Sequence, residues 1–379
     1  MRFGNTRQVT CRAAAGDCLR PGGFGYHIDT MSDERTIDVA VVGVGRMGRH
    51  HARTYRQMAG VNLAAVVDTD TDRAAEIADE FGCPYYGDTD ELLTRAPSVR
   101  AVSVAVPTVH HQAVAAPLLE RRIACLVEKP LAPTMRQAKA LADVAETHGA
   151  ILQVGHTERF NPAVRAVAAM GVTPRFIEVD RVSPMTFRSL DVGVVMDMMI
   201  HDLDIVLMLA DSPLARIDAA GVAVLAEHED VANARLVFAS GCVANLTASR
   251  LALKTERKLR LFSEHCYVSL DYQKRSGVMI RQAANAAALE RVRHQIADGL
   301  DLSDLDYSDL VHVEELTMDL PPGEDDPLTA ELLSFVDAVR TGRRPSVDAA
   351  AGYAAVDAAE RVGAAIRAHK WVGLAESPV

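Results

Sequence analysis

Three ionisable side chains at helical spacing lie in an apolar stretch that we expect to be a helix over residues 193–209. Asp197 and His201 are four residues apart, and Asp204 follows three residues later. In a regular helix this spacing places all three on one face. Burying charges in so apolar a helix is costly unless they are paired or used. The pattern therefore predicts a functional site, with a hydrogen-bonded core histidine as the alternative for His201.

The same residue types indicate acid–base chemistry. An imidazole with an ordinary pKa of about 6.5 suits His201 to take a proton from an alcohol, and Asp197 would orient and stabilise it. Lys129 is one of six lysines among 40 lysines and arginines. Its compact ammonium could hydrogen-bond the reacting oxygen, and it competes for the Asp197 carboxylate. The alternative for Lys129 is a solvated surface charge.

A glycine-rich turn indicates a dinucleotide site. A short β-branched run over residues 37–42 ends in the letters GVGRMG, and a helix is expected to follow. Gly43 permits the tight turn, Gly45 lets the backbone approach a pyrophosphate, and Gly48 allows close helix packing. Asp68 lies 20 residues beyond Gly48 at the end of the next strand, where it would accept hydrogen bonds from ribose hydroxyls. A turn that serves packing alone is the alternative.

The elements that would position these residues alternate between strand and helix. After residue 42, strands are expected over residues 63–67, 101–106, 124–127 and 151–154, with helices between them. Repeated βα units predict a parallel doubly wound sheet, whose ligands gather beyond the carboxyl ends of its strands. The residues at that edge include Pro107, Thr108, Glu128, Lys129 and His156.

A second domain with a mostly antiparallel sheet is expected after this α/β unit. The expected strands cover residues 175–183, 217–226, 231–238, 242–251, 258–262, 266–272 and 278–281, and helices are expected over residues 327–341 and 349–369. We expect a disordered or mis-assigned extension over residues 1–34, followed by a Rossmann domain over residues 35–157. A substrate-binding and oligomerisation α+β domain is expected over residues 158–345. A C-terminal helix over residues 346–379 is expected to pack back on the domains. Translation starting at Met31 would explain the extension.

Composition disfavours several other classes. The formal charge is −11, so the whole-surface field repels nucleic acid and anionic lipid. No apolar stretch reaches the roughly 20 residues that a membrane span needs. The six cysteines are scattered without a CxxC pair, which argues against disulfides and a metal site and favours the reduced cytoplasm.

Four motifs together resemble the Gfo/Idh/MocA oxidoreductases. They are GVGRMG at residues 43–48, a proline and histidine at 107 and 111, EKP at 128–130 and DMMIH at 197–201. In that family the EKP lysine and the DxxxH aspartate and histidine line the active site, which implies the same for Lys129, Asp197 and His201. The resemblance also implies NAD as cofactor and a homodimer or homotetramer formed through the open face of the sheet. The cofactor-binding residues it implies are Gly43, Gly45, Arg46, Met47, Gly48, Asp68, Pro107, Thr108, His111, Glu128 and Lys129.

Two further segments, GHTERFNP at residues 155–162 and DVGVV at 191–195, are similar to the UDP-N-acetylglucosamine 3-dehydrogenase branch of the family. Members of that branch oxidise the sugar 3-hydroxyl to a ketone, which an aminotransferase can convert to a 2,3-diamino sugar for lipid A or surface polysaccharide. The expected substrate-binding residues are Arg159, Asn161, Arg181 and Arg188, because guanidinium groups bind phosphate oxygens. A plain surface charge is the alternative for each arginine.

Other functions stay open at this point. The substrate could be the corresponding UDP-uronic acid or a free sugar or polyol such as inositol. A non-enzymatic NAD-binding regulatory protein is a further alternative, against which the intact Lys129 and His201 argue. Asp68 predicts a preference for NAD over NADP, tempered by Arg46 and Arg73.

Overall fold

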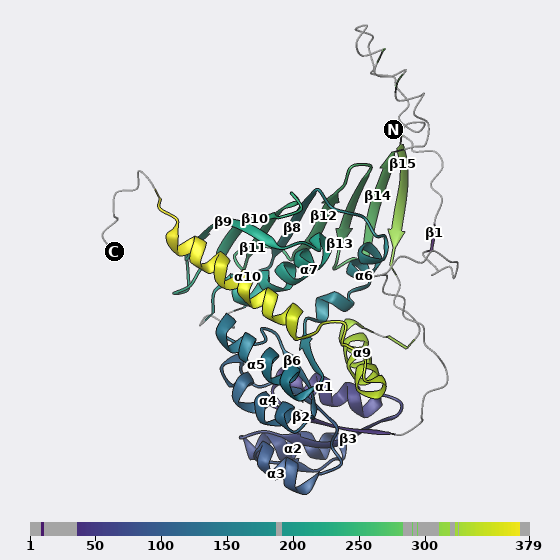
Figure 1. Ribbon diagram of the computed structural model, residues 1–379, viewed down its shortest axis with the longest axis vertical. Helices are drawn as coiled ribbons and strands as arrows, with labels where there is room; N and C mark the ends of the chain where they lie inside the picture. Colours follow the sequence, from purple (N-terminus) through teal and green to yellow (C-terminus); the bar gives the residue numbers. More distant parts are fainter. Residues whose placement is uncertain are drawn as a thin grey trace.

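The computed structural model describes residues 9–10, 36–186, 192–282, 311–318 and 326–371, together with residues 290, 294, 323 and 324. These residues form two sheets with helices packed against them, and Figure 1 shows the sheets at opposite ends of the longest axis. One sheet is parallel and the other is mostly antiparallel, which confirms the α/β fold class.

The parallel sheet has the strand order β4-β3-β2-β5-β6-β7. Its strands are β2 (Ile37–Val42), β3 (Val61–Val67), β4 (Tyr85–Tyr86), β5 (Ala101–Val104), β6 (Ala124–Glu128) and β7 (Leu152–Gly155). Strands β5, β6 and β7 are buried along their whole length, as expected for a parallel sheet covered on both faces. The doubly wound prediction is therefore confirmed.

Helices connect these strands. They are α1 (Arg46–Gln57), α2 (Thr71–Phe81), α3 (Thr89–Arg95), the short 3₁₀ turn η1 (Thr108–His110) with α4 (His111–Glu120), and α5 (Met135–His148). Side-chain caps fix their starts: Asp70 accepts from the backbone of α2, Asp88 from that of α3, and Thr134 from that of α5. In contrast, α1 begins at Gly45 without a side-chain cap.

The second sheet has the order β1-β15-β14-β13-β12-β8-β11-β10-β9. Its strands are β1 (Val9–Thr10), β8 (Phe176–Val182), β9 (Leu214–Val222), β10 (Val231–Phe238), β11 (Val243–Ser249), β12 (Glu256–Phe262), β13 (Cys266–Asp271), β14 (Ser276–Gln282) and β15 (Val311–Thr317). Burial alternates along β8 and β10, so one face of the sheet is packed and the other is more exposed. The helical elements η2 (Thr157–Phe160), α6 (Pro162–Ala169), η3 (Val195–Met199) and α7 (Ile200–Ala210) connect the two sheets or lie against the packed face.

The position of β8 differs from simple hairpin order. This strand pairs parallel with β11 and antiparallel with β12, although β9 and β10 lie between it and β11 in the chain. Strand β8 therefore lies at the centre of the sheet. The strand β15 and the helices α3 and α6 were not predicted.

Two C-terminal helices join the halves. Helix α9 (Pro327–Thr341) packs on α1 and η2, and α10 (Ala349–Ala368) packs on α5, α7 and β9. Figure 1 shows α10 crossing between the two sheets. At Gly352 an added Cβ would lie 2.4 Å from the Val154 side chain, so the helix approaches the end of β7 closely. The exact domain limits remain predictions, and most of residues 1–34 lie outside the described part of the chain.

Candidate active site

The turn between β2 and α1 is packed so tightly that two of its glycines are sterically required. A Cβ on Gly43, whose φ is +84°, would lie 2.7 Å from the Val106 nitrogen, and one on Gly48 would lie 1.8 Å from the Gly43 oxygen. A Cβ on Gly45 would meet nothing within 4 Å. The turn is thus closed on its inner side and open at the start of α1, whose uncapped N–H groups suit a pyrophosphate.

The other residues expected at the dinucleotide site lie at the start of α1 or beside the turn. Arg46 and Met47 are exposed in the first turn of α1. Asp68 accepts hydrogen bonds from the backbone of Val44 at 2.9 Å and from Arg73 Nη2 at 3.2 Å. Asp68 therefore lies beside the glycine turn. Arg73, one of the two arginines expected to offset its charge, contacts it.

His111 is turned inward. Its ring is buried, with Nε2 2.9 Å from the Val106 oxygen and Nδ1 3.0 Å from the Pro130 oxygen. Burial lowers the pKa of His111 below its ordinary value. The carbonyls of Val106, Pro130 and Leu131 and the charge of Glu128 oppose this shift without cancelling it. These contacts join the segment after β5, which contains the exposed Pro107 and the half-buried Thr108, to the segment after β6. His111 thus positions backbone that follows two strands.

Glu128 is also directed into the protein. Its Oε1 lies 3.0 Å from Nε2 of the fully buried His51 on α1, and its Oε2 accepts from the Lys129 backbone at 3.2 Å. Burial raises the pKa of Glu128, but the hydrogen bond and charge of His51 outweigh it and lower the pKa below its ordinary value. His51 was not predicted, because a histidine on a helix face is commonly a solvated residue.

A third buried carboxyl, Glu331 on α9, interacts electrostatically with Glu128. Burial, followed by the Glu128 charge, raises the pKa of Glu331 well above its ordinary value. Glu331 accepts from Thr157 Oγ1 at 2.9 Å, and its backbone oxygen accepts from Gln153 Nε2 at 3.1 Å. This polar cluster lies directly behind the Lys129 backbone and was not predicted.

The segment carrying Asp197 is not a regular α-helix. Residues 195–199 form the π turn η3, in which the Ile200 N–H reaches the Val195 oxygen five residues back. A π turn interrupts the regular α-helical spacing on which that shared face was predicted. The predicted pairing of Asp197 with His201 is therefore wrong: Asp197 contacts Lys129 instead. Lys129 Nζ donates to the Asp197 backbone oxygen at 2.7 Å and lies 3.5 Å from its Oδ1.

Asp204, the third member of the predicted face, is used elsewhere. Its carboxylate binds Arg159, with Nε at 2.5 Å and Nη2 at 2.7 Å. The Arg159 guanidinium is thus engaged inside the fold, and Arg159 is not among the residues that line the cavity described below. Asn161 is buried, caps α6 by accepting from Ala163, and donates to Glu158 at 3.3 Å.

His201 lies close to cations, and within the described residues no carboxylate contacts its ring. Burial lowers its pKa well below its ordinary value, and the charges of Lys129, Arg181, His156 and Arg257 lower it further. Its ring centroid is 6.5 Å from that of the fully buried His156, with the rings nearly perpendicular. His201 is therefore neutral at neutral pH and able to accept a proton.

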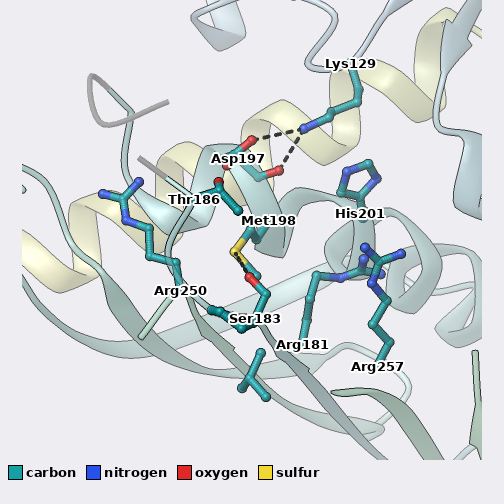
Figure 2. Close-up of a pocket in the computed structure, with 11 residues that line it drawn as sticks. Lys129, Arg181, Ser183, Thr186, Asp197, Met198, His201, Arg250 and Arg257 are labelled. Atoms are coloured by element: carbon teal, nitrogen blue, oxygen red, sulfur yellow. Dashed lines mark hydrogen bonds and ion pairs between the residues drawn. The ribbon is translucent and has the colours of Figure 1, made fainter. Parts of the chain in front are cut away.

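A cavity of about 190 Å³ brings these groups together. Its lining residues are Lys129, Arg181, Val182, Ser183, Pro184, Thr186, Asp197, Met198, His201, Arg250 and Arg257. Figure 2 shows Lys129 bound to Asp197 on one side and Arg181 and Arg257 together beside His201. Three of the predicted catalytic residues thus meet in one cavity, whereas Arg188 lies outside the described residues. Arg250 and Arg257 were not predicted.

Comparison with known proteins identifies the family. Residues 37–156 match the "Oxidoreductase family, NAD-binding Rossmann fold", and residues 164–268 match the GFO/IDH/MocA C-terminal domain. A protein named UDP-N-acetylglucosamine 3-dehydrogenase from Acidithiobacillus ferrooxidans is 33% identical over 330 residues, which cover 86% of this chain and 96% of that protein. The chain belongs to the Gfo/Idh/MocA family.

Solved structures agree with this assignment. The structure of the Acidithiobacillus ferrooxidans enzyme superposes on this Gfo/Idh/MocA member with a TM-score of 0.75 at 32% identity, covering 88% of this chain and 98% of that one. Levoglucosan dehydrogenase shares the fold at 18% identity, with a TM-score of 0.74 over 89% of this chain and 98% of that one. The scyllo-inositol 2-dehydrogenase (NAD(+)) of Bacillus subtilis is 28% identical over 57% of this chain and 68% of its own length. The resemblance deduced from four motifs is confirmed, and the chain carries the family's NAD-binding Rossmann domain.

Among the described residues, no helix combines the length and apolar character that crossing a bilayer requires.

Proposed function

We propose that this chain is an NAD-dependent dehydrogenase that oxidises the 3-hydroxyl of UDP-N-acetylglucosamine to a 3-keto sugar. The observation that carries the proposal is the meeting of Lys129, from the end of a Rossmann strand, with His201, from the second domain, in one cavity. The similarity to a UDP-N-acetylglucosamine 3-dehydrogenase over nearly that protein's whole length supports this substrate.

In the proposed reaction the alcohol loses a proton and a hydride, and a carbonyl forms at carbon 3. His201, neutral because its pKa is low, takes the hydroxyl proton. Lys129 donates a hydrogen bond to the same oxygen and stabilises its developing negative charge. The glycine turn and Asp68 would hold NAD, which would supply the hydride acceptor. The cations that keep His201 neutral also favour the alkoxide.

Asp197 has a positioning role in this proposal. Its backbone oxygen and carboxylate both contact Lys129 Nζ, at 2.7 Å and 3.5 Å. They direct the ammonium into the cavity, which Asp197 and Lys129 both line. The carboxylate that was expected to orient the base therefore orients the lysine.

Oxidation of a free polyol is a second candidate, favoured by the similarity to the Bacillus subtilis scyllo-inositol 2-dehydrogenase. The cationic side chains of the cavity favour an anionic substrate over it. A UDP-uronic acid would also satisfy those cations. A purely regulatory role would leave the Lys129 and His201 pairing without a purpose.

The proposed product suggests a biosynthetic setting. An aminotransferase could convert the 3-keto sugar to a 2,3-diamino sugar for lipid A or surface polysaccharide, and we propose functional coupling to such an enzyme. We further propose a homodimer or homotetramer acting in the cytoplasm. Chemical cross-linking and size measurement in solution test the assembly.

A substrate panel tests the proposed function. The protein is incubated with NAD and, separately, UDP-N-acetylglucosamine, its uronic acid, N-acetylglucosamine and inositol, and products are analysed by mass spectrometry. We expect NADH formation and a product two mass units lighter only with the UDP-sugars, and faster with UDP-N-acetylglucosamine. Faster turnover of a free sugar would overturn the proposal.

A further inference from the structure

Two arginines lie directly opposite each other across neighbouring strands. The antiparallel register of β8 and β12 pairs Arg181 with Arg257. Like charges at directly opposite positions destabilise a sheet unless an anion compensates them. One carboxylate oxygen, Glu158 Oε1, accepts from Nη1 of both arginines, each at 3.1 Å. The pair is therefore held together by a single shared anion.

The two guanidinium groups differ in how many of their N–H donors are hydrogen-bonded. Arg181 is 4% exposed, and its Nε and Nη2 donate to Asp202 at 2.6 Å and 2.8 Å. The side chain of Arg257 is 46% exposed, and its contact within the described residues is the bond from Nη1 to Glu158. A guanidinium has five N–H donors, so Arg257 keeps most of its donors for another group.

The guanidinium of Arg257, with its unbonded N–H donors, lies in the reaction cavity. It lines the same cavity as Lys129 and His201, and Figure 2 shows its guanidinium beside that of Arg181, facing His201. The buried Asp202 and Asp230 pair with Arg181 and Arg250. Neither of these carboxylates lines the cavity. The counter-charges of the arginines thus lie behind the cavity wall, whereas Asp197, which contacts Lys129, lines the cavity itself.

We infer that Arg257 binds the diphosphate of the sugar nucleotide, a role for which neither Arg159 nor Arg181 has comparable free capacity. This inference rests on the proposed function. A planar guanidinium fork matches the oxygens of a phosphate. The diphosphate is attached to carbon 1 of the ring whose carbon 3 reacts, so its binding group must lie near His201, as Arg257 does.

Substitution of Arg257 tests the inference. Arg257→Gln removes the charge but can still donate to Glu158. We expect the KM for UDP-N-acetylglucosamine to rise about 10–100-fold, the loss typical of one charged hydrogen bond, with kcat changed less than about threefold. The KM for NAD and the melting temperature should stay at wild-type values. Arg257→Lys keeps the charge without the fork and should give an intermediate KM.

Arg175→Gln is the matched control, because Arg175 is exposed just before β8, at the end far from Arg181, and its side chain forms an ion pair with the exposed Glu264 at 3.7 Å. It should leave both constants unchanged. An unchanged KM in an active Arg257→Gln enzyme would overturn the inference while the proposed function stands. Wild-type protein inactive on every UDP-sugar would instead overturn the proposed function.

Two additional substrates identify the anion. If Arg257 binds the diphosphate, Arg257→Gln raises the KM for UDP-N-acetylglucosamine and for its uronic acid by similar factors. A rise confined to the uronic acid would assign Arg257 to the sugar carboxylate and overturn the diphosphate assignment. N-acetylglucosamine has neither anion, so any residual oxidation of it should be equal in both proteins.

Discussion

In the proposed reaction His201 acts as the base, and its surroundings keep it neutral. We expect His201→Asn to lower kcat about 10²–10⁴-fold, the range for a lost acid–base group, with much smaller changes in substrate and NAD affinity. Steady-state kinetics together with direct binding titrations check this. A variant that keeps the wild-type rate would transfer the role of base to Lys129.

The low pKa of His201 predicts the pH dependence. The base acts only when neutral, so the rate rises with pH through its pKa. This limb should lie below pH 6.5, because burial and the charges of Lys129, Arg181 and Arg257 lower that pKa. A wild-type limb centred above pH 7 in a plot of kcat/KM would contradict this account.

In the proposed reaction Lys129 contributes to both the rate and that pH profile. Lys129→Ala should retain NAD binding and lose most turnover, because the ammonium contacts the reacting oxygen. Its charge lowers the pKa of His201, so its removal should move the acid limb of the residual rate to higher pH. Near-normal turnover with an unmoved limb would leave Lys129 outside the reaction.

We expect Asp68 to govern the cofactor preference. Its carboxylate lies beside the glycine turn, where it would repel the 2′-phosphate of NADP, and Arg73 at 3.2 Å reduces this effect only in part. We expect a preference for NAD, and Asp68→Ser should weaken NAD binding about 10–100-fold. Fluorescence titrations with both cofactors measure this. Equal or tighter NADP binding by the wild-type protein would refute it.

At the level of helices and strands, α9 is joined to the Rossmann domain through a buried carboxyl. The raised pKa of Glu331 means that the folded protein keeps a proton that the unfolded chain releases above its ordinary pKa of 4.5. Stability is therefore lost as pH rises from that value toward the folded pKa. Glu331→Gln avoids this loss and should stabilise the protein at pH 7 by roughly 1–3 kcal/mol.

Melting temperatures of both proteins between pH 4.5 and pH 8 check this prediction. The difference should be small at the acidic end and grow with pH. A variant that is less stable than wild type throughout this range would show that Glu331 is ionised and paired in the folded protein.

Elements with strong local patterns could be predicted from the sequence. The expected limits of β10 and α9 agree with the structure because alternation and helical period are clear there. The acidic strand β15 (Val311–Thr317) was missed, since its two glutamates and following polar residues hide the alternation. The central position of β8 depends on long-range pairing that no local pattern encodes.

The site was predicted only as far as residue types allow. Lys129 and His201 follow recognisable motifs, and they do meet in one cavity. The π turn that directs Asp197 to Lys129 is a departure from regular helix spacing and has no clear sequence signal. Arg257 faces the cavity because β12 lies beside β8, so its role depends on the unpredicted strand order.

For the molecule as a whole, the site exists only because two domains meet. Lys129 belongs to the parallel sheet, whereas His201 and Arg257 belong to the second domain, and α9 and α10 pack against both parts. Although the chain carries a formal charge of −11, the cavity is lined by cations. Local charge rather than net charge therefore determines which substrate is attracted.

The most direct test of the central claim uses UDP-N-acetylglucosamine carrying deuterium at carbon 3. If His201 and Lys129 act on the 3-hydroxyl, the deuterium must appear in the reduced NAD, and the 3-keto product must lack it. Mass spectrometry of both products after a single turnover measures the transfer. Deuterium retained in the sugar while NAD is reduced would show that another carbon is oxidised and would contradict the account.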